Sequence, residues 1–213
     1  MTNKPCRLAI LLSGTGSTMV NLQDHIARGE LPAEIVVVVS SRSKVLGVER
    51  AKERSIPTEI LGRKPFKKDG VFDDVAYSNA LVDVLESYHP DLVVMAGFMT
   101  RLAEPLLRRY DVVNVHPALL PMFGGEGYYG HHVHEAVLTS GVKITGATVH
   151  FADAKYDHGP IICQEAVSVL EDDTPHTLAD RVQAAERRIY PKAIALFAKG
   201  LLKREDGRVR VLG

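Results

Sequence analysis

Two polar side chains interrupt an apolar run near the middle of the chain, and their types are suited to acid–base chemistry. The run reads Val112-Val113-Asn114-Val115-His116-Pro117. Side chains alternate along a strand, so Asn114 and His116 are predicted to point to one face. Two polar groups on one face of a buried strand cost free energy unless they are paired or used. The pair is therefore either a satisfied structural pair or a reactive amide and imidazole.

Histidines gather in the same part of the sequence, where six of the nine fall between His116 and His158. One interpretation is a zinc site, because the spacing His132-Val133-His134 can chelate a metal. The other is a polar loop with one structural histidine. The H-E-x-x-H motif is absent and Cys163 is the only thiol nearby, so we expect no metal.

A carboxylate, Asp157, lies downstream in the polar segment Lys155-Tyr156-Asp157-His158-Gly159-Pro160. A carboxylate in a loop is usually solvated. A carboxylate that folds back against a histidine instead favours the imidazolium. The residues alone leave both interpretations open.

A glycine-containing turn, Ser13-Gly14-Thr15-Gly16-Ser17-Thr18, follows the first predicted strand and precedes the first predicted helix. In an open α/β sheet such a turn lies at the carboxyl edge, where free N–H groups at a helix start favour a phosphate. The turn matches neither the dinucleotide nor the nucleoside-triphosphate glycine pattern. It is therefore a phosphate cradle of another kind or a tight turn without a ligand.

The elements that must position these residues alternate between strands and helices in the first half. Buried strands are predicted at 7–12, 34–39, 58–61, 92–95 and 112–115, and helices at 19–28, 46–54, 73–88 and 105–109. The segment Gly62–Gly70 is interpreted as a loop. Strand–helix alternation predicts an α/β fold with a doubly wound, mostly parallel, Rossmann-like sheet.

The second half differs and predicts an antiparallel C-terminal extension. Two long β-rich runs, 144–151 and 161–169, flank a polar segment and are expected to pair antiparallel. Helices are predicted at 133–138 and 177–199. The final residues contain Asp206-Gly207 between two apolar runs, which is a hairpin signal.

Composition excludes several classes of protein. The 213 residues fit one domain, and 46% apolar with 24% charged residues is typical of globular proteins. Lysine plus arginine equals aspartate plus glutamate at 26 each, so the basic excess typical of nucleic-acid binders is absent. The first apolar run is too short for a signal peptide and no run is long enough to span a membrane. We expect a cytoplasmic protein with reduced cysteines, and neither a nucleic-acid nor a membrane partner.

Taken together, these motifs resemble a known family, the phosphoribosylglycinamide formyltransferases of the folate-dependent formyltransferase superfamily. The resemblance runs nearly from end to end. It is carried by Ser13–Ser17, Met95-Ala96-Gly97-Phe98-Met99, Asn114-Val115-His116-Pro117-Ala118-Leu119-Leu120-Pro121, Gly146–Phe151, Asp157-x-Gly159-Pro160 and Arg181–Pro191.

The resemblance implies roles for the matching positions. Asn114 would contact the formyl oxygen, His116 would be the proton donor, and Asp157 would hold His116 and raise its pKa. Gly16, Ser17 and Thr18 would bind the substrate phosphate, and Glu186 its ribose hydroxyls. Folate contacts would come from Asn114 and from the loop Met99, Thr100, Arg101 and Leu102, while Ala152–Asp157 would wrap the pterin.

The resemblance also implies the reaction and its partners. A single domain, 1–213, would bind phosphate with about residues 1–110 and would bind folate and catalyse with about residues 111–213. It would move a formyl group from 10-formyltetrahydrofolate, as co-substrate and without metal, to glycinamide ribonucleotide in purine biosynthesis, as a monomer or homodimer. The alternatives are a formyltetrahydrofolate hydrolase and a non-catalytic phosphate-ligand binding module.

Three positions depart from the family pattern. Thr18 stands where asparagine is usual, Thr100 where arginine or lysine is usual, and His158 where a small residue is common. Arg101 is the neighbouring cation that could replace the one missing at Thr100. Four glycines in Gly124–Gly130 are compatible with a mobile lid.

Overall fold

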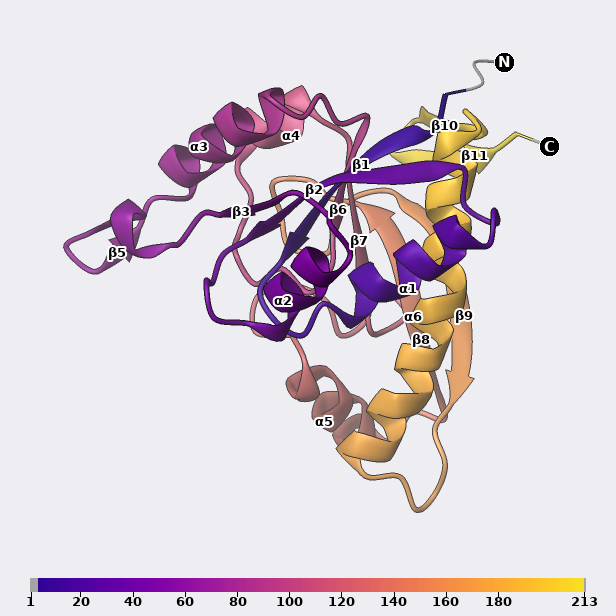
Figure 1. The fold of residues 1–213 in the computed structure, drawn as a ribbon. Coiled ribbons are helices and arrows are strands. Elements are labelled where there is room, and N and C mark those ends of the chain that lie inside the picture. Colours follow the sequence, from indigo (N-terminus) through magenta and orange to yellow (C-terminus); the bar gives the residue numbers. More distant parts are fainter. Residues whose placement is uncertain (1–3, 213) are drawn as a thin grey trace. The chain divides into compact units, whose positions relative to one another are not determined.

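The computed structural model describes residues 4–212 (Figure 1). These residues form two compact units divided between Val113 and Asn114. The division falls inside one strand, β7 (Val112–His116), so the first two residues of that strand belong to one unit and its last three to the other. This strand carries the Asn114 and His116 pair.

The first unit is a parallel sheet with helices. Its other sheet strands are β1 (Cys6–Leu12), β2 (Ala33–Ser40), β3 (Thr58–Ile60) and β6 (Leu92–Met95). Its helices are α1 (Ser17–Ala27), α2 (Leu46–Glu53), α3 (Asp74–Glu86) and α4 (Glu104–Arg109). Every strand pair of this unit's sheet runs parallel.

Burial explains why the strands of this unit read as continuous apolar runs. Residues 8–12 of β1, 37–39 of β2 and 92–94 of β6 have no exposed surface. Strands of a parallel sheet covered on both faces need apolar side chains at every position, not at alternate ones. The core of the first unit therefore lies on these three strands.

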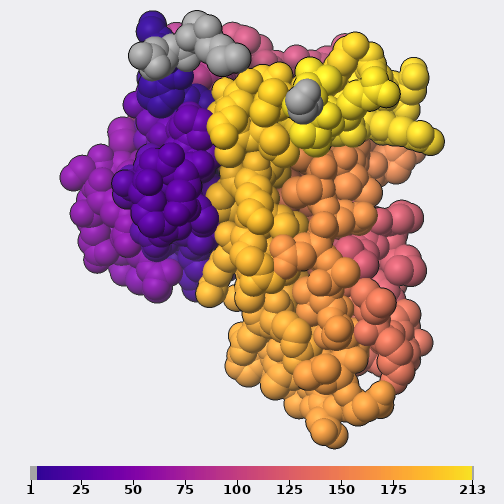
Figure 2. Space-filling view, turned by 90° about the vertical axis from the view of Figure 1, so that its right-hand side faces the viewer, coloured from indigo at the N-terminus to yellow at the C-terminus, as the bar shows by residue number. Residues whose placement is uncertain are grey.

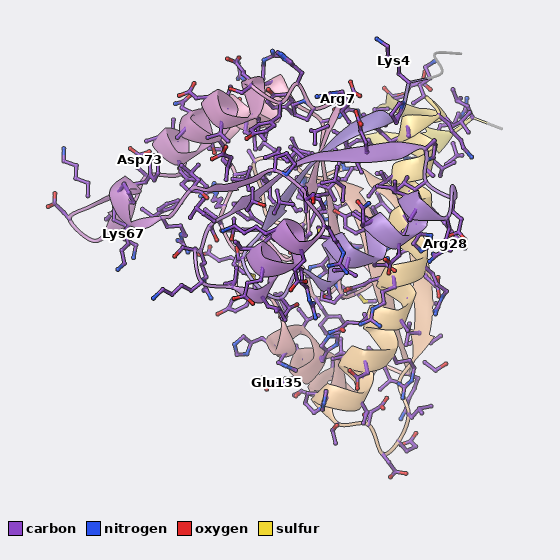
Figure 3. The ribbon with its side chains drawn as sticks, viewed as in Figure 1. Lys4, Arg7, Arg28, Lys67, Asp73 and Glu135 are labelled. Atoms are coloured by element: carbon purple, nitrogen blue, oxygen red, sulfur yellow. The ribbon has the colours of Figure 1, made fainter. Side chains whose placement is uncertain are left out.

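A small projection extends this unit between β3 and α3. It consists of the 3₁₀ turn η1 (Lys64–Phe66) and the antiparallel pair β4 (Lys67–Lys68) and β5 (Val71–Phe72). Figure 3 labels Lys67 and Asp73 on it. The prediction that Gly62–Gly70 is only a loop is wrong to this extent. The turn is pinned because Asp73 N donates to the Phe66 carbonyl at 2.8 Å and the Phe66 ring packs on Tyr77.

The second unit is built on an antiparallel strand pair. Its elements after β7 are α5 (His131–Ser140), β8 (Ile144–Phe151), β9 (Ile161–Ser168), α6 (Pro175–Ala198), β10 (Leu202–Glu205) and β11 (Arg208–Val211). The antiparallel pairing of β8 with β9 and the hairpin of β10 with β11 confirm both predictions for this half. Figure 2 shows α6 along one face of this unit, with the β10–β11 hairpin near one end.

Helix α6 begins two residues before its predicted start at Thr177. Thr174 caps the helix, since its hydroxyl accepts from Thr177 N at 3.2 Å and its N–H donates to the Thr177 hydroxyl at 3.0 Å. Pro175 then occupies the first turn, where a missing N–H costs nothing.

Seven strands are hydrogen-bonded in the order β3-β2-β1-β6-β7-β8-β9. The predicted mostly parallel α/β sheet with an antiparallel C-terminal extension is confirmed. Within residues 4–212, none of the helices is both long and apolar enough to cross a membrane.

Candidate functional site

The glycine turn of the first unit is held by the backbone of two neighbouring segments. Gly47 N, in α2, donates to the Gly14 carbonyl at 3.0 Å, and Ser13 N donates to the Gly97 carbonyl at 3.2 Å. Gly16 has a φ of 72°, in the left-handed region, and a Cβ there would lie 2.7 Å from Gly47 Cα. Gly16 is therefore required both by its conformation and by the close approach of α2.

The electrostatics of this turn favour an anion. Helix α1 starts at Ser17, so the N–H groups of its first turn lack intrahelical acceptors and the positive end of the helix dipole lies behind them. The Ser17 side chain is exposed and that of Thr18 is half-buried. Arg50, from α2, donates to the Thr15 carbonyl at 3.0 Å and adds a cation beside the turn. The turn is thus built as a phosphate cradle would be.

The segment that the resemblance assigns to folate follows β6 in the same unit. Met99 and Arg101 are exposed, whereas Thr100 and Leu102 are buried. Met99 N donates to the Ser13 hydroxyl at 3.1 Å, so this segment and the glycine turn are joined directly. The Arg101 guanidinium lies 3.4 Å from the Asp74 carboxylate, which therefore competes with any ligand carboxylate for that cation.

In the second unit, the chain brings together the three groups predicted to be catalytic. The His116 side chain is buried, and its Nδ1 lies 3.3 Å from Asp157 Oδ2. Asn114, two residues earlier on β7, places its Nδ2 3.3 Å from His150 Nε2. The same His150 nitrogen is 3.7 Å from the other Asp157 oxygen. Residues 41 positions apart thus form one cluster around a single carboxylate.

Both ring nitrogens of His116 face hydrogen-bond acceptors. Nε2 lies 2.7 Å from the Phe123 carbonyl, which can only accept, so Nε2 carries a hydrogen. Nδ1 faces the Asp157 carboxylate. A hydrogen on each ring nitrogen would satisfy both acceptors.

The Asp157 carboxylate is held from a second direction. Its side chain is only 11% exposed, and Oδ2 accepts a hydrogen bond from Gly125 N at 3.1 Å. Asp157 itself has a φ of 53°, a left-handed conformation that aspartate and asparagine adopt more readily than most residues. The glycine-rich segment Gly124–Gly130 therefore contacts Asp157, and the residue before it, Phe123, contacts His116.

Side chains from β8 and β9 fix the segment that follows His116. Thr148 donates to the Ala118 carbonyl at 2.6 Å and accepts from Leu120 N at 3.1 Å. Gln164 donates to the Leu120 carbonyl at 3.0 Å and to the Thr148 hydroxyl at 2.9 Å. This network joins the backbone at Ala118 and Leu120 to β8 and β9.

Glu186, predicted to contact ribose, lies in α6 of the second unit and is half-buried. Burial raises the pKa of Glu186 to about 7, with Arg187 acting in the opposite direction. A carboxyl group that is partly protonated near neutral pH can both donate to and accept from a hydroxyl.

The histidines of the second unit separate into different roles. His134, on α5, is buried, and burial lowers its pKa to about 4. His132 and His158 are exposed and lie beside Glu135 and Asp153 respectively. Within residues 4–212, no group of three or more histidine, cysteine or acidic side chains is arranged so that it could hold a metal ion.

Sequence reasoning missed several residues that the geometry places beside the predicted ones. Gly47 and Arg50 support the glycine turn, and the Phe123 carbonyl and Gly125 N–H contact His116 and Asp157 respectively. Backbone groups leave no trace in residue types, so those two contacts had no signal. His150 had one, because a histidine within the apolar strand 144–151 must have a polar partner.

The fold is a mostly parallel α/β sheet. One of its strands carries an amide and an imidazole, and a carboxylate lies beside the imidazole. Together these features define a class of protein equipped for acyl-type group transfer. The chain belongs to the formyl transferase family, whose family model matches residues 6–194.

Two relatives and one solved structure show how far the likeness extends. "Trifunctional purine biosynthetic protein adenosine-3" of Bos taurus is 41% identical over 97% of this chain and 20% of its own length. "Phosphoribosylglycinamide formyltransferase, chloroplastic" of Arabidopsis thaliana is 37% identical over 94% of this chain and 68% of its own. The crystal structure of glycinamide ribonucleotide transformylase 1 from Symbiobacterium toebii has a TM-score of 0.90 and 37% identity, covering 100% of this chain and 96% of that one. The chain spans about a fifth of the length of the trifunctional relatives it matches.

Proposed function

We propose that this chain transfers the formyl group of 10-formyltetrahydrofolate to the amine of glycinamide ribonucleotide, giving formylglycinamide ribonucleotide and tetrahydrofolate in de novo purine biosynthesis. The observation that carries the proposal is the Asn114, His116 and Asp157 cluster, with the His116 Nδ1 to Asp157 Oδ2 distance at 3.3 Å, in a chain of the formyl transferase family. The relatives whose names contain this activity support the choice of substrates.

The chemistry needs no nucleophilic side chain, because the ribonucleotide amine attacks the formyl carbon itself. The C–N bond to the new amine forms, the carbonyl electrons move to oxygen, and the bond to the folate nitrogen then breaks. The attacking nitrogen gives up one proton and the departing nitrogen receives one, so no net proton is gained or lost as the carbonyl re-forms. The demands on the protein are to stabilise the oxyanion and to move this proton to the departing nitrogen. The amide of Asn114 has a second N–H beyond the one facing His150 and can donate it to the oxyanion.

We assign to His116 the transfer of a proton to the departing folate nitrogen. The His116 Nε2–H faces the Phe123 carbonyl, so proton transfer requires that carbonyl to give way to the reacting atoms. The Asp157 carboxylate stabilises the positive charge that the ring carries before it gives up the proton. Such positioned proton transfer contributes about 10²- to 10⁴-fold to rate.

Substrate binding is assigned to the remaining predicted residues. Gly16, Ser17 and Thr18 bind the phosphate, since they open α1 beside the Arg50 cation. Glu186 binds the ribose hydroxyls. The loop Met99–Leu102 and the segment Ala152–Asp157 bind the folate, with Arg101 shared between the folate carboxylate and Asp74. We place the reaction in the cytoplasm, with the chain as a monomer or homodimer and no metal.

The test is an assay of folate product formed from 10-formyltetrahydrofolate with and without glycinamide ribonucleotide. Turnover that depends on the ribonucleotide is expected. Equal turnover without it would identify a hydrolase, and no turnover with intact binding of the ribonucleotide would identify a phosphate-ligand binding module.

Replacing Gly16 tests the phosphate assignment. Gly16→Val is expected to weaken ribonucleotide binding at least about tenfold, because its Cβ would lie 2.7 Å from Gly47 Cα and displace the first turn of α1. Folate binding should change much less. Titration calorimetry with each substrate measures both.

Gly14→Ala is the matched control in the same turn, since a Cβ at Gly14 meets nothing within 4 Å. A Gly16→Val protein that folds and keeps its ribonucleotide affinity would show that the turn is only a strand-to-helix connection.

A further inference from the structure

His150 is a buried histidine at the centre of the candidate site to which the reaction above gives no task. It lies on β8, is 1% exposed, and has its Nδ1 2.9 Å from the Phe151 carbonyl. Its Nε2 faces Asn114 Nδ2 at 3.3 Å and Asp157 Oδ1 at 3.7 Å. Both ring nitrogens are thus committed to named partners.

The partner of Nδ1 determines the tautomer of the ring. A backbone carbonyl only accepts, so Nδ1 must carry the hydrogen. In the neutral ring Nε2 is then bare and accepts. The Asn114 atom facing it must be the amide nitrogen, and the amide oxygen must point the other way. The Phe151 carbonyl therefore fixes the tautomer of His150, and that tautomer determines that the Asn114 amide nitrogen, not its oxygen, faces His150.

We propose that His150 is a positioning residue for formyl transfer: it holds the Asn114 amide in the one orientation that offers an N–H to the formyl oxygen. The inference rests on the proposed function, because it assumes that Asn114 donates to that oxygen. If the Asn114 amide were reversed, its oxygen would face His150 and neither of its N–H groups would be in position to donate to the formyl oxygen.

Burial supports this assignment, because it keeps the ring an acceptor. Burial lowers the pKa of His150, the nearby His116 acts in the same direction, and the Phe151 carbonyl, Asp157 and Asp153 act against it. A His150 ring that stays neutral leaves Nε2 free to accept from Asn114. Two histidines beside one carboxylate thus have different tasks: His116 moves a proton, and His150 accepts a hydrogen bond from Asn114.

The variants separate the acceptor at Nε2 from the volume of the ring. His150→Leu fills similar space without an acceptor and is expected to lower kcat about 10- to 100-fold, with the KM of each substrate changed less than about threefold. His150→Gln offers an amide oxygen near the place of Nε2. Its fall in log kcat should therefore be at most about half of the fall seen in His150→Leu. Thr145→Val, a buried near-isosteric change on the same strand, should leave kcat unchanged.

A double-mutant cycle with Asn114→Ala shows whether His150 acts through Asn114. If it does, adding His150→Leu to Asn114→Ala costs less than about twofold in kcat. Full additivity of the two losses, or equal loss in His150→Gln and His150→Leu, would overturn the proposal. If the wild-type protein shows no turnover, the proposed function itself is overturned, and the role of His150 is then tested by the turnover-independent measurement that follows.

Nitrogen NMR of the imidazole gives a readout that does not depend on turnover. The His150 ring is expected as the neutral tautomer with hydrogen on Nδ1 between about pH 6 and pH 8. Its Nε2 resonance should shift in Asn114→Ala, because an accepted hydrogen bond is lost. A ring with hydrogen on Nε2, or one that is charged in this range, would overturn the proposal even if His150→Leu fails to fold.

Discussion

Asp157→Asn is expected to lower kcat for formyl transfer by about 10²- to 10⁴-fold while changing the KM of either substrate by less than about fivefold. The carboxylate lies 3.3 Å from His116 Nδ1 and is 11% exposed, so its charge acts on the ring with little screening by water. That charge matters most once the oxyanion forms and the proton must move. Its loss should therefore appear in the rate of the chemical step, not in binding.

Asparagine is the substitution that isolates charge at this position. Asp157 has a φ of 53°, and asparagine tolerates that conformation as aspartate does. The asparagine oxygen can still accept from Gly125 N, which bonds to Oδ2 at 3.1 Å. A change to alanine would disturb the loop as well and would not separate the two effects.

Steady-state kinetics with both substrates varied measures the effect. Asp180→Asn is the matched control, because it removes the same charge from an exposed position on α6. Near wild-type turnover in Asp157→Asn would show that the pairing with His116 is structural. A loss confined to KM would assign Asp157 to binding and not to proton transfer.

The fold was predictable from the sequence where one physical effect dominates. Strands β1, β2 and β6 are buried at every described position in their centres, so their apolar runs predicted a parallel sheet. Asn114 and His116 were found for the converse reason, since polar groups in a buried strand are costly. Their period-two spacing predicted that they share a face, and both reach the cluster around Asp157.

What could not be predicted depends on contacts between distant segments or on backbone groups. Gly47 matters because its Cα lies only 2.7 Å from the place that a Cβ of Gly16 would take, and nothing in the spacing of 31 residues signals that contact. The Phe123 carbonyl and Gly125 N–H contact His116 and Asp157, yet every residue has such groups. His150 was visible as a histidine, but its partner Asn114 is 36 residues away and on another strand.

Gly159→Ala is expected to lower the free energy of unfolding by about 3 kcal/mol, and Tm by about 10 °C, from a single added methyl group. A Cβ at Gly159 would lie 1.9 Å from the Phe151 carbonyl oxygen and 3.0 Å from its carbon. Both atoms belong to backbone at the end of β8, so no side-chain rotation relieves the overlap. The Phe151 N–H also donates to the Pro160 carbonyl at 2.9 Å, and separating the two segments would stretch that bond.

The same methyl group should also lower kcat, because Gly159 is two residues from Asp157 and lies at the end of the loop that carries Asp157. Any shift that relieves the overlap moves that loop, and a displacement of about 1 Å at a catalytic group can cost about 10²-fold in rate. Thermal unfolding and kcat are measured together, with Gly62→Ala as the control because a Cβ there meets nothing within 4 Å. Since Gly159 has no positive φ, alanine adds no conformational strain, and the whole effect is steric. A Gly159→Ala protein as stable and as active as wild type would mean that β8 and the Asp157 loop are not packed as closely as this contact requires.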